Sequence, residues 1–111
     1  MNEDPFLQAL TALEEVIADN DRRARLIKKR MARIRRARAQ GLPYSDMVSN
    51  ENGPLIVQLL TESSTALGSW GANVRRAEAQ ALYEEGMTMD QIAERFGVTR
   101  QRVSALLRKA R

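Results

Sequence analysis

Residues 88–108, Thr88-Met-Asp-Gln-Ile-Ala-Glu-Arg-Phe-Gly-Val-Thr-Arg-Gln-Arg-Val-Ser-Ala-Leu-Leu-Arg108, predict two short helices joined by a tight turn. Two short helices can pack at a steep angle only where the contact residue is small, and Ala93 lies where the first helix needs one. Gly97 follows that helix, and glycine tolerates the positive φ that the turn requires. The stretch therefore favours an all-α fold for this end of the chain.

The apolar residues of this stretch recur at the spacing that lines one face of each helix. They are Ile92, Phe96, Val98, Val103 and Leu106. We expect them to form one small core shared by both helices. Thr88, or Asp90 one turn later, can cap the first helix, and Thr99 directly precedes Arg100 as a good N-cap for the second.

A supporting helix is expected just upstream, from Val74 to Glu85, and it stops at Gly86. Its apolar residues are Val74, Ala77, Ala81 and Leu82. It completes the three-helix unit on which helix-turn-helix motifs usually rest. The alternative, a small helical domain with a solvated basic face, does not explain why caps, turn and core agree.

Residues 90–103, Asp-Gln-Ile-Ala-Glu-Arg-Phe-Gly-Val-Thr-Arg-Gln-Arg-Val, resemble the promoter-reading helix-turn-helix of bacterial primary sigma factors. The chain is more distantly similar to the C-terminal DNA-binding domains of DNA invertases and resolvases. The resemblance covers about forty residues, Ala72 to Arg111. It implies that the second helix enters the major groove, and the groove-facing set would be Arg100, Gln101, Arg102, Ser104 and Ala105. The expected DNA contacts also include Thr88, Thr99, Arg108 and Lys109.

Composition favours a small nucleic-acid binder over an enzyme. The 111 residues include no cysteine and no histidine, which removes disulfides, thiolate metal sites and the commonest general base. We therefore expect no catalytic residue, cofactor or metal. No apolar stretch approaches membrane-spanning length, and the start Met-Asn-Glu-Asp-Pro lacks a signal-peptide pattern. The expected location is the cytoplasm, on the nucleoid, with no membrane partner.

The net charge of +4 hides a segregation of charge along the chain. Residues 1–21 carry six acids and no base, and residues 22–38 carry ten bases and no acid. Residues 39–71 carry three acids and no base, and residues 72–111 carry eight bases against five acids. Segregated charge produces a strong local field where a net value would not.

The basic block, Arg22 to Arg38, has two interpretations. Phosphate contacts by Arg33, Arg35 and Arg36 would grip DNA without reading its sequence. Alternatively the block is a solvated face whose charges pair with the acids of residues 1–21 on a neighbouring antiparallel helix. Two copies of the chain paired antiparallel, acidic half on basic half, would satisfy both blocks in this way. The sequence leaves both interpretations open.

One long helix is predicted from Pro5, with Asp4 as its N-cap, because no Gly or Pro follows before Gly41. Some 35 residues make a rod of roughly 50 Å, which cannot bury an apolar stripe alone. The stripe alternates steps of four and three, as in a heptad seam with one polar residue, Asn20. The seam consists of Phe6, Leu10, Leu13, Ile17, Asn20, Ala24, Ile27, Met31 and Ile34.

Two partners can cover the seam. A second copy of the chain would form a homodimer in which Asn20 sets the register. An apolar helix predicted at Pro54 to Leu67 can pack beside it in the same core, through Leu55, Ile56, Leu59, Leu60 and Leu67. The homodimer contacts are expected at Phe6, Leu10, Leu13, Ile17, Asn20, Ile27, Met31 and Ile34. The competing structure is a break at Asp19-Asn-Asp21 that would give a hairpin of two short helices.

Gly68 and Gly71 predict a hinge after the apolar helix. The expected domains are a helical dimerisation and basic-rod module at 1–71 and a helix-turn-helix DNA-binding domain at 72–111. Together these features predict a homodimeric, sequence-specific DNA-binding transcription regulator of bacterial type, with double-stranded DNA as its partner. The rival functions are a nucleoid-associated, architectural DNA-binding protein and a sigma-like factor that docks on RNA polymerase.

Overall fold

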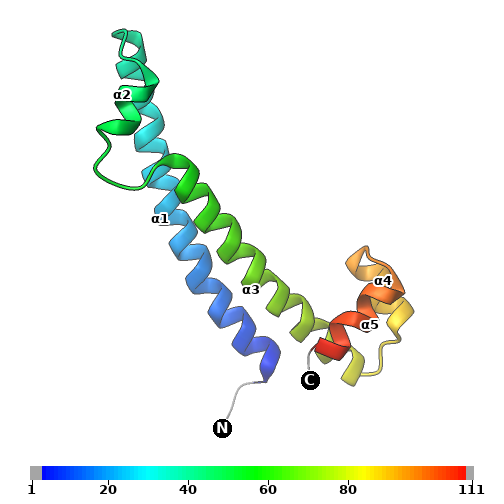
Figure 1. Cartoon of the computed structure of the whole chain (residues 1–111). Helices are drawn as coiled ribbons and strands as arrows, with labels where there is room; N and C mark the ends of the chain where they lie inside the picture. Colours follow the sequence, from blue (N-terminus) through cyan, green and yellow to red (C-terminus); the bar gives the residue numbers. More distant parts are fainter. Residues whose placement is uncertain (1–3, 110–111) are drawn as a thin grey trace. The chain divides into compact units, whose positions relative to one another are not determined.

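The computed structural model describes residues 4–109, except for the side chain of Lys109. This part of the chain forms five helices and no strand (Figure 1), which confirms the all-α fold. The helices are α1 (Pro5–Ala39), α2 (Tyr44–Ser49), α3 (Ile56–Glu84), α4 (Met89–Phe96) and α5 (Arg100–Lys109). The described residues divide into two compact units, one of residues 15–67 and one that combines residues 4–14 with residues 68–109.

The long helix α1 is confirmed at the predicted position. The Asp4 carboxylate accepts a hydrogen bond from the Leu7 N–H at 2.8 Å, as an N-cap does. The helix ends before Gly41, whose φ of 87° is of the kind that glycine adopts without strain. Between these ends the helix is continuous for 35 residues. The alternative of a break at Asp19-Asn-Asp21 is therefore wrong.

A short helix that the sequence pattern does not predict, α2, follows the end of α1. Pro43 precedes it with an extended backbone, at φ −66° and ψ 145°. The Arg38 guanidinium lies 4.3 Å from the centroid of the Tyr44 ring, a cation–π contact between the end of α1 and the start of α2.

The helix α3 runs through Gly68 and Gly71 without interruption. Neither glycine has a positive φ. The predicted hinge at these residues is therefore wrong, because both glycines lie inside a continuous helix. The predicted apolar helix and the predicted supporting helix are parts of this one element, and the domain boundary at residue 71 stays a prediction.

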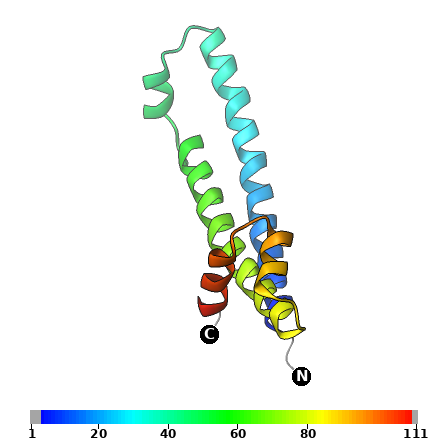
Figure 2. The same cartoon turned by 90° about the vertical axis from the view of Figure 1, so that its right-hand side faces the viewer.

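In the unit of residues 15–67, α1 and α3 lie side by side in both views (Figures 1 and 2). The Asn20 side-chain amide donates to the Ser63 carbonyl oxygen at 3.5 Å, and Arg23 Nε lies 3.4 Å from a Glu62 carboxylate oxygen. Since later residues of α1 meet earlier residues of α3, the two helices are antiparallel. Asn20, the polar residue of the seam, is thus bonded within the chain.

The helix α3 covers only part of the seam that the sequence predicts on α1. Within residues 15–67, Asn20 and Ile27 are half-buried, whereas Ile17, Met31 and Ile34 are 44%, 38% and 36% exposed. Ala24 is also exposed. In the other unit, the seam residues Phe6, Leu10 and Leu13 are all half-buried. The role of the seam in a homodimer stays a prediction.

Candidate nucleic-acid interface

The first helix of the helix-turn-helix, α4, begins at a reciprocal cap. The Thr88 hydroxyl accepts the Gln91 N–H at 3.1 Å, and the Gln91 side-chain oxygen accepts the Thr88 N–H at 2.9 Å. Such a capping box satisfies two backbone donors that would otherwise have no partner. Of the two predicted caps, Thr88 is therefore the N-cap, and Asp90 lies in the first turn.

The turn and the second helix also follow the prediction. Gly97 adopts the left-handed conformation, with φ 70° and ψ 33°, directly after α4. The Thr99 hydroxyl accepts the Arg102 N–H at 3.1 Å and caps α5. The starts of both helices and the turn between them are set by residues next to them in the sequence. The caps and the turn together define where α4 ends and α5 begins.

The core of the helix-turn-helix is complete within its own unit. Ile92 and Val103 have no exposed surface, and Ala93 is 6% exposed where a small contact residue is predicted. The remaining buried members are Ala79, Leu106 and Leu107, and the partly buried members are Leu82, Met87, Met89 and Phe96. Val98 is 39% exposed, so its placement in the core is wrong. Ala79 and Leu107 are core residues that the sequence pattern does not single out.

The outer face of α5 carries the predicted base-reading residues. Val103, Leu106 and Leu107 fix which side of α5 is buried. At 3.6 residues per turn, Gln101 and Arg108 then lie opposite the core. The long polar side chains of this set are exposed: Arg100, Gln101, Arg102 and Arg108. The short side chains of Ser104 and Ala105 are half-buried.

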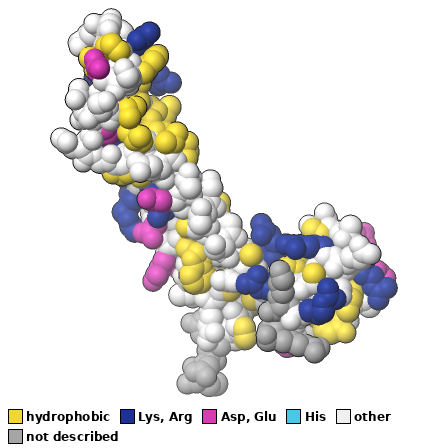
Figure 3. Space-filling model, viewed as in Figure 1, with side chains coloured by type: hydrophobic (Ala, Val, Ile, Leu, Met, Phe, Trp, Pro, Cys, Tyr) yellow, Lys and Arg dark blue, Asp and Glu magenta, His cyan; other side chains and the backbone are white. Residues whose placement is uncertain are grey.

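Two side-chain contacts are made by residues of this face. The Arg108 guanidinium donates to the Ser104 hydroxyl at 2.8 Å, one turn away on the same helix. Arg100 Nε lies 3.8 Å from an Asp90 carboxylate oxygen, and both side chains are well exposed. Figure 3 shows dark blue Lys and Arg side chains gathered over the helix-turn-helix. The face is therefore basic and accessible.

Three residues of the predicted DNA-contacting set differ from the exposed residues of α5: two cap helices, and the side chain of the third is not described. Thr88 and Thr99 use their hydroxyl groups to cap α4 and α5, so their first role is to hold the helices. Lys109 ends α5, and its side chain lies outside the described residues.

The basic block on α1 is partly paired within the chain. Arg23 pairs with Glu62, and Arg33 lies 3.3 Å from Glu51. Arg35 and Arg36 are exposed and form no ion pair among residues 4–109. These two arginines are thus the members of the predicted gripping set that are open to a phosphate.

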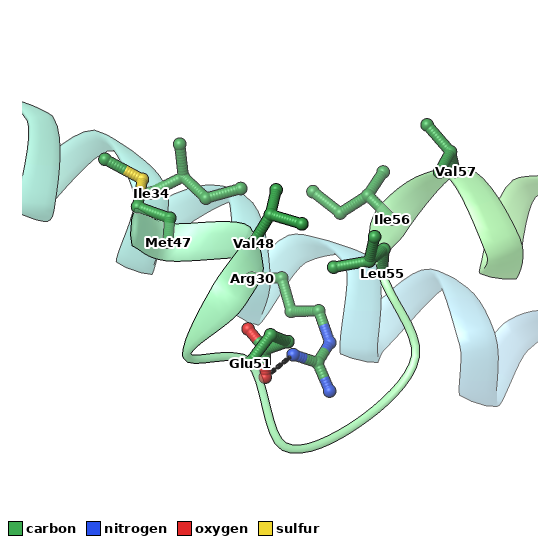
Figure 4. A pocket seen from close by; sticks show the side chains of 8 residues that line it. All are labelled: Arg30, Ile34, Met47, Val48, Glu51, Leu55, Ile56 and Val57. Atoms are coloured by element: carbon green, nitrogen blue, oxygen red, sulfur yellow. Dashed lines mark ion pairs between the residues drawn. The ribbon is translucent and has the colours of Figure 1, made fainter. Parts of the chain in front are cut away.

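One member of the basic block is buried, which its sequence context does not predict. Arg30 is only 7% exposed and pairs with Glu51 (Figure 4). This pairing, with Arg33 adding to it, lowers the pKa of the Glu51 carboxyl below its ordinary value of 4.5. In Figure 4 the guanidinium points toward Glu51, while apolar side chains gather on the other side of the Arg30 stem. They line a cavity of about 200 Å³ together with that stem.

Residues 74–111 match the protein family described as Sigma-70, region 4. The C-terminal part of the chain is a region 4-like helix-turn-helix domain. The match indicates a DNA-binding, transcription-related role for this domain. No curated protein and no solved structure matches the chain. None of the helices between residues 4 and 109 combines the length and the apolar character that crossing a bilayer requires.

Proposed function

We propose that this chain is a homodimeric, sequence-specific DNA-binding transcription regulator of bacterial type that acts on the nucleoid in the cytoplasm. The outer face of α5 carries the proposal. Gln101 and Arg108 project opposite the core, and Arg100 and Arg102 flank them, all of them exposed. A helix that is capped at its start and packed on a closed core presents these side chains in a fixed geometry, as base reading requires.

The residue types fit base edges and phosphates. Gln suits the bidentate edge of adenine, and Arg suits that of guanine. We assign base reading to Gln101 and Arg100, near the start of α5. Arg102 and Arg108 supply phosphate or further base contacts. The Arg100 guanidinium pairs with Asp90, and because this pair is exposed and weak, DNA can replace Asp90 as its partner.

The test is a selection of bound genomic fragments, followed by footprinting on the selected sites. Gln101→Ala should reduce discrimination between a selected site and scrambled DNA by about 1–3 kcal/mol, because one bidentate pair is removed. The matched control is Gln40→Ala, an exposed glutamine outside the helix-turn-helix, which should leave discrimination unchanged. Unchanged discrimination in Gln101→Ala would remove the base-reading assignment.

A second measurement distinguishes contacts with DNA phosphates from contacts with base edges. Replacing Arg35 and Arg36 with Gln should weaken binding to selected and scrambled DNA alike. It should also lower the salt slope by up to about 0.9 for each phosphate that is no longer neutralised. Arg33 is left unchanged because its pairing with Glu51 would confuse an effect on folding with an effect on DNA binding. An unaltered salt slope would mean that α1 does not touch DNA.

The rival functions give different outcomes in the same experiments. An architectural protein would bind scrambled and selected DNA equally, through the exposed Lys and Arg side chains of α1 and α5. A sigma-like factor that docks on RNA polymerase would be recovered with polymerase in a pull-down from which DNA has been removed. The exposed and ordered face of α5 favours the regulator.

A further inference from the structure

The unit of residues 15–67 exposes large apolar side chains on both of its long helices. On α1 these are Ile17 and Met31, and on α3 they are Val57, Leu60 and Leu67. The most exposed of them are Val57 at 64% and Leu60 at 51%. In Figure 3 hydrophobic side chains gather on the visible face of this unit.

Four of these side chains, Ile17, Met31, Leu60 and Leu67, lie on the same side of the helix pair. Ile17 follows the buried Val16 by one residue, and Leu60 follows the buried Leu59 by one residue. One residue turns a right-handed helix by about 100°. Because α1 and α3 run in opposite directions, both turns lead to one side of the pair. Met31 and Leu67 lie two heptads and one heptad further along, on the same side of their helices.

The size of this face indicates a partner. Its side chains leave on the order of several hundred Å² of apolar surface exposed, which is the upper end of what monomers show. Two antiparallel helices with a second apolar stripe are half of a four-helix bundle. The missing half is then another pair of the same kind.

We propose that a second copy of this chain packs on this face in the antiparallel direction, about a twofold axis near Ala24. The proposal rests on the homodimer of the proposed function and adds its face and its direction. Ile17 and Met31 each lie seven residues from Ala24. An axis through Ala24 therefore places Ile17 of one copy against Met31 of the partner subunit. The small side chain of Ala24 permits close approach at the axis.

Charge selects the antiparallel direction. From residue 15 to residue 21, α1 carries only acids, and from residue 22 to residue 38 only bases. Beside the apolar stripe, Asp21 and Lys28 are exposed and form no ion pair among the described residues. They lie symmetrically about residues 24 and 25. An antiparallel partner brings Asp21 against Lys28 of the partner subunit, whereas a parallel partner sets like charges together, which is unfavourable.

Cysteine cross-linking tests the direction, and the chain offers a clean background because it has no cysteine. In the antiparallel dimer, two copies of residue 17 lie roughly 20 Å apart along the axis, since each lies seven residues from it at about 1.5 Å per residue. A disulfide needs Cα atoms within about 7 Å. After oxidation, the Ile17→Cys variant alone should therefore stay uncross-linked. A mixture of the Ile17→Cys and Met31→Cys variants should cross-link, and so should the Ala24→Cys variant on its own. Cross-linking of Ile17→Cys alone would overturn the antiparallel direction.

The matched control for the face is Thr65→Cys. Thr65 is exposed on α3 of the same unit but lies roughly 140–160° around the helix from Leu60 and Leu67. It should not cross-link. If it does so as readily as Ala24→Cys, the dimer uses another face and the proposal fails.

Charge reversal gives an independent readout. Asp21→Lys and Lys28→Asp should each weaken the dimer by roughly fivefold in sedimentation, because two symmetric pairs become repulsive. The double variant Asp21→Lys/Lys28→Asp should restore the affinity. Failure of the double variant to recover, while each single variant is weakened, would contradict the pairing.

The dimer interface and the DNA-reading role can fail independently in these experiments. A cross-linked dimer that selects no genomic site would overturn the regulator and leave the interface in place. A chain with monomeric mass in light scattering that still selects a site would overturn the interface and leave the base-reading face of α5 in place.

Discussion

The helix-turn-helix and the helical pair of residues 15–67 differ in how completely each buries its own apolar residues. In the helix-turn-helix, Ile92 and Val103 are fully buried. In the helical pair, Val16 and Leu59 are buried, but Val57 and Leu60 are more than half exposed. Short helices are unstable alone, so α4 and α5 need a closed core. The longer α1 and α3 can persist with one apolar stripe uncovered, which leaves that stripe for a partner.

The largest expected effect concerns the closed core of the helix-turn-helix and is tested by a pair of identical substitutions there. Val103→Ala should lower the free energy of unfolding by about 2–3 kcal/mol, because it removes two buried methyl groups and leaves a cavity. Val98→Ala should cost less than about 1 kcal/mol, since Val98 is 39% exposed. Urea denaturation followed by circular dichroism measures both. Equal decreases would mean that the core extends to Val98.

The elements that the sequence predicts well are those set by local chemistry. Thr88, Gly97 and Thr99 act within three residues of their own positions, and each one takes the cap or turn conformation that its type favours. The length of α1 is also local, because no Gly or Pro interrupts it between Pro5 and Gly41. The dimer, the base-reading set and the basic grip remain predictions, since they need a partner to be seen.

The elements that the sequence does not predict depend on contacts between distant segments. Arg30 looks like one charge among ten, and it is buried because Glu51 returns to it from the connection between α2 and α3. Val98 has the spacing of a core residue, but it lies in the turn between α4 and α5 and remains 39% exposed. Gly68 lowers the local helix propensity, yet α3 continues through it from Ile56 to Glu84.

A smaller effect is expected at the Arg30 and Glu51 pair, because the Glu51 side chain remains 16% exposed. Glu51→Gln should destabilise the helical pair at neutral pH by leaving the buried Arg30 charge without its counterion. The folded-state pKa of Glu51 is lowered, so its contribution is present above the ordinary value of 4.5 and is lost as the pH falls below it. The difference between wild type and variant should therefore shrink on acidification.

The control for Glu51 is Glu62→Gln, which removes a carboxylate that is 57% exposed and paired with Arg23. Exposed pairs contribute little, so this variant should change the melting temperature slightly at neutral pH. Thermal melts of both variants from neutral pH down to acidic pH, below the ordinary pKa of a glutamate, provide the comparison. A pH-independent gap between wild type and Glu51→Gln would show that the effect comes from packing and not from the carboxylate charge.

The smallest expected effect tests whether α3 is a continuous helix where the sequence predicts a hinge. A Cβ at Gly68 would meet nothing within 4 Å, so Gly68→Ala should raise stability by about 0.5–1 kcal/mol through better helix propensity. The matched control is Gly41→Ala, which also has open space but a φ of 87°, and it should lower stability by about 1 kcal/mol. Opposite signs in thermal melts would establish that conformation alone separates the two glycines. A destabilised Gly68→Ala would instead mean that α3 bends at this residue in solution.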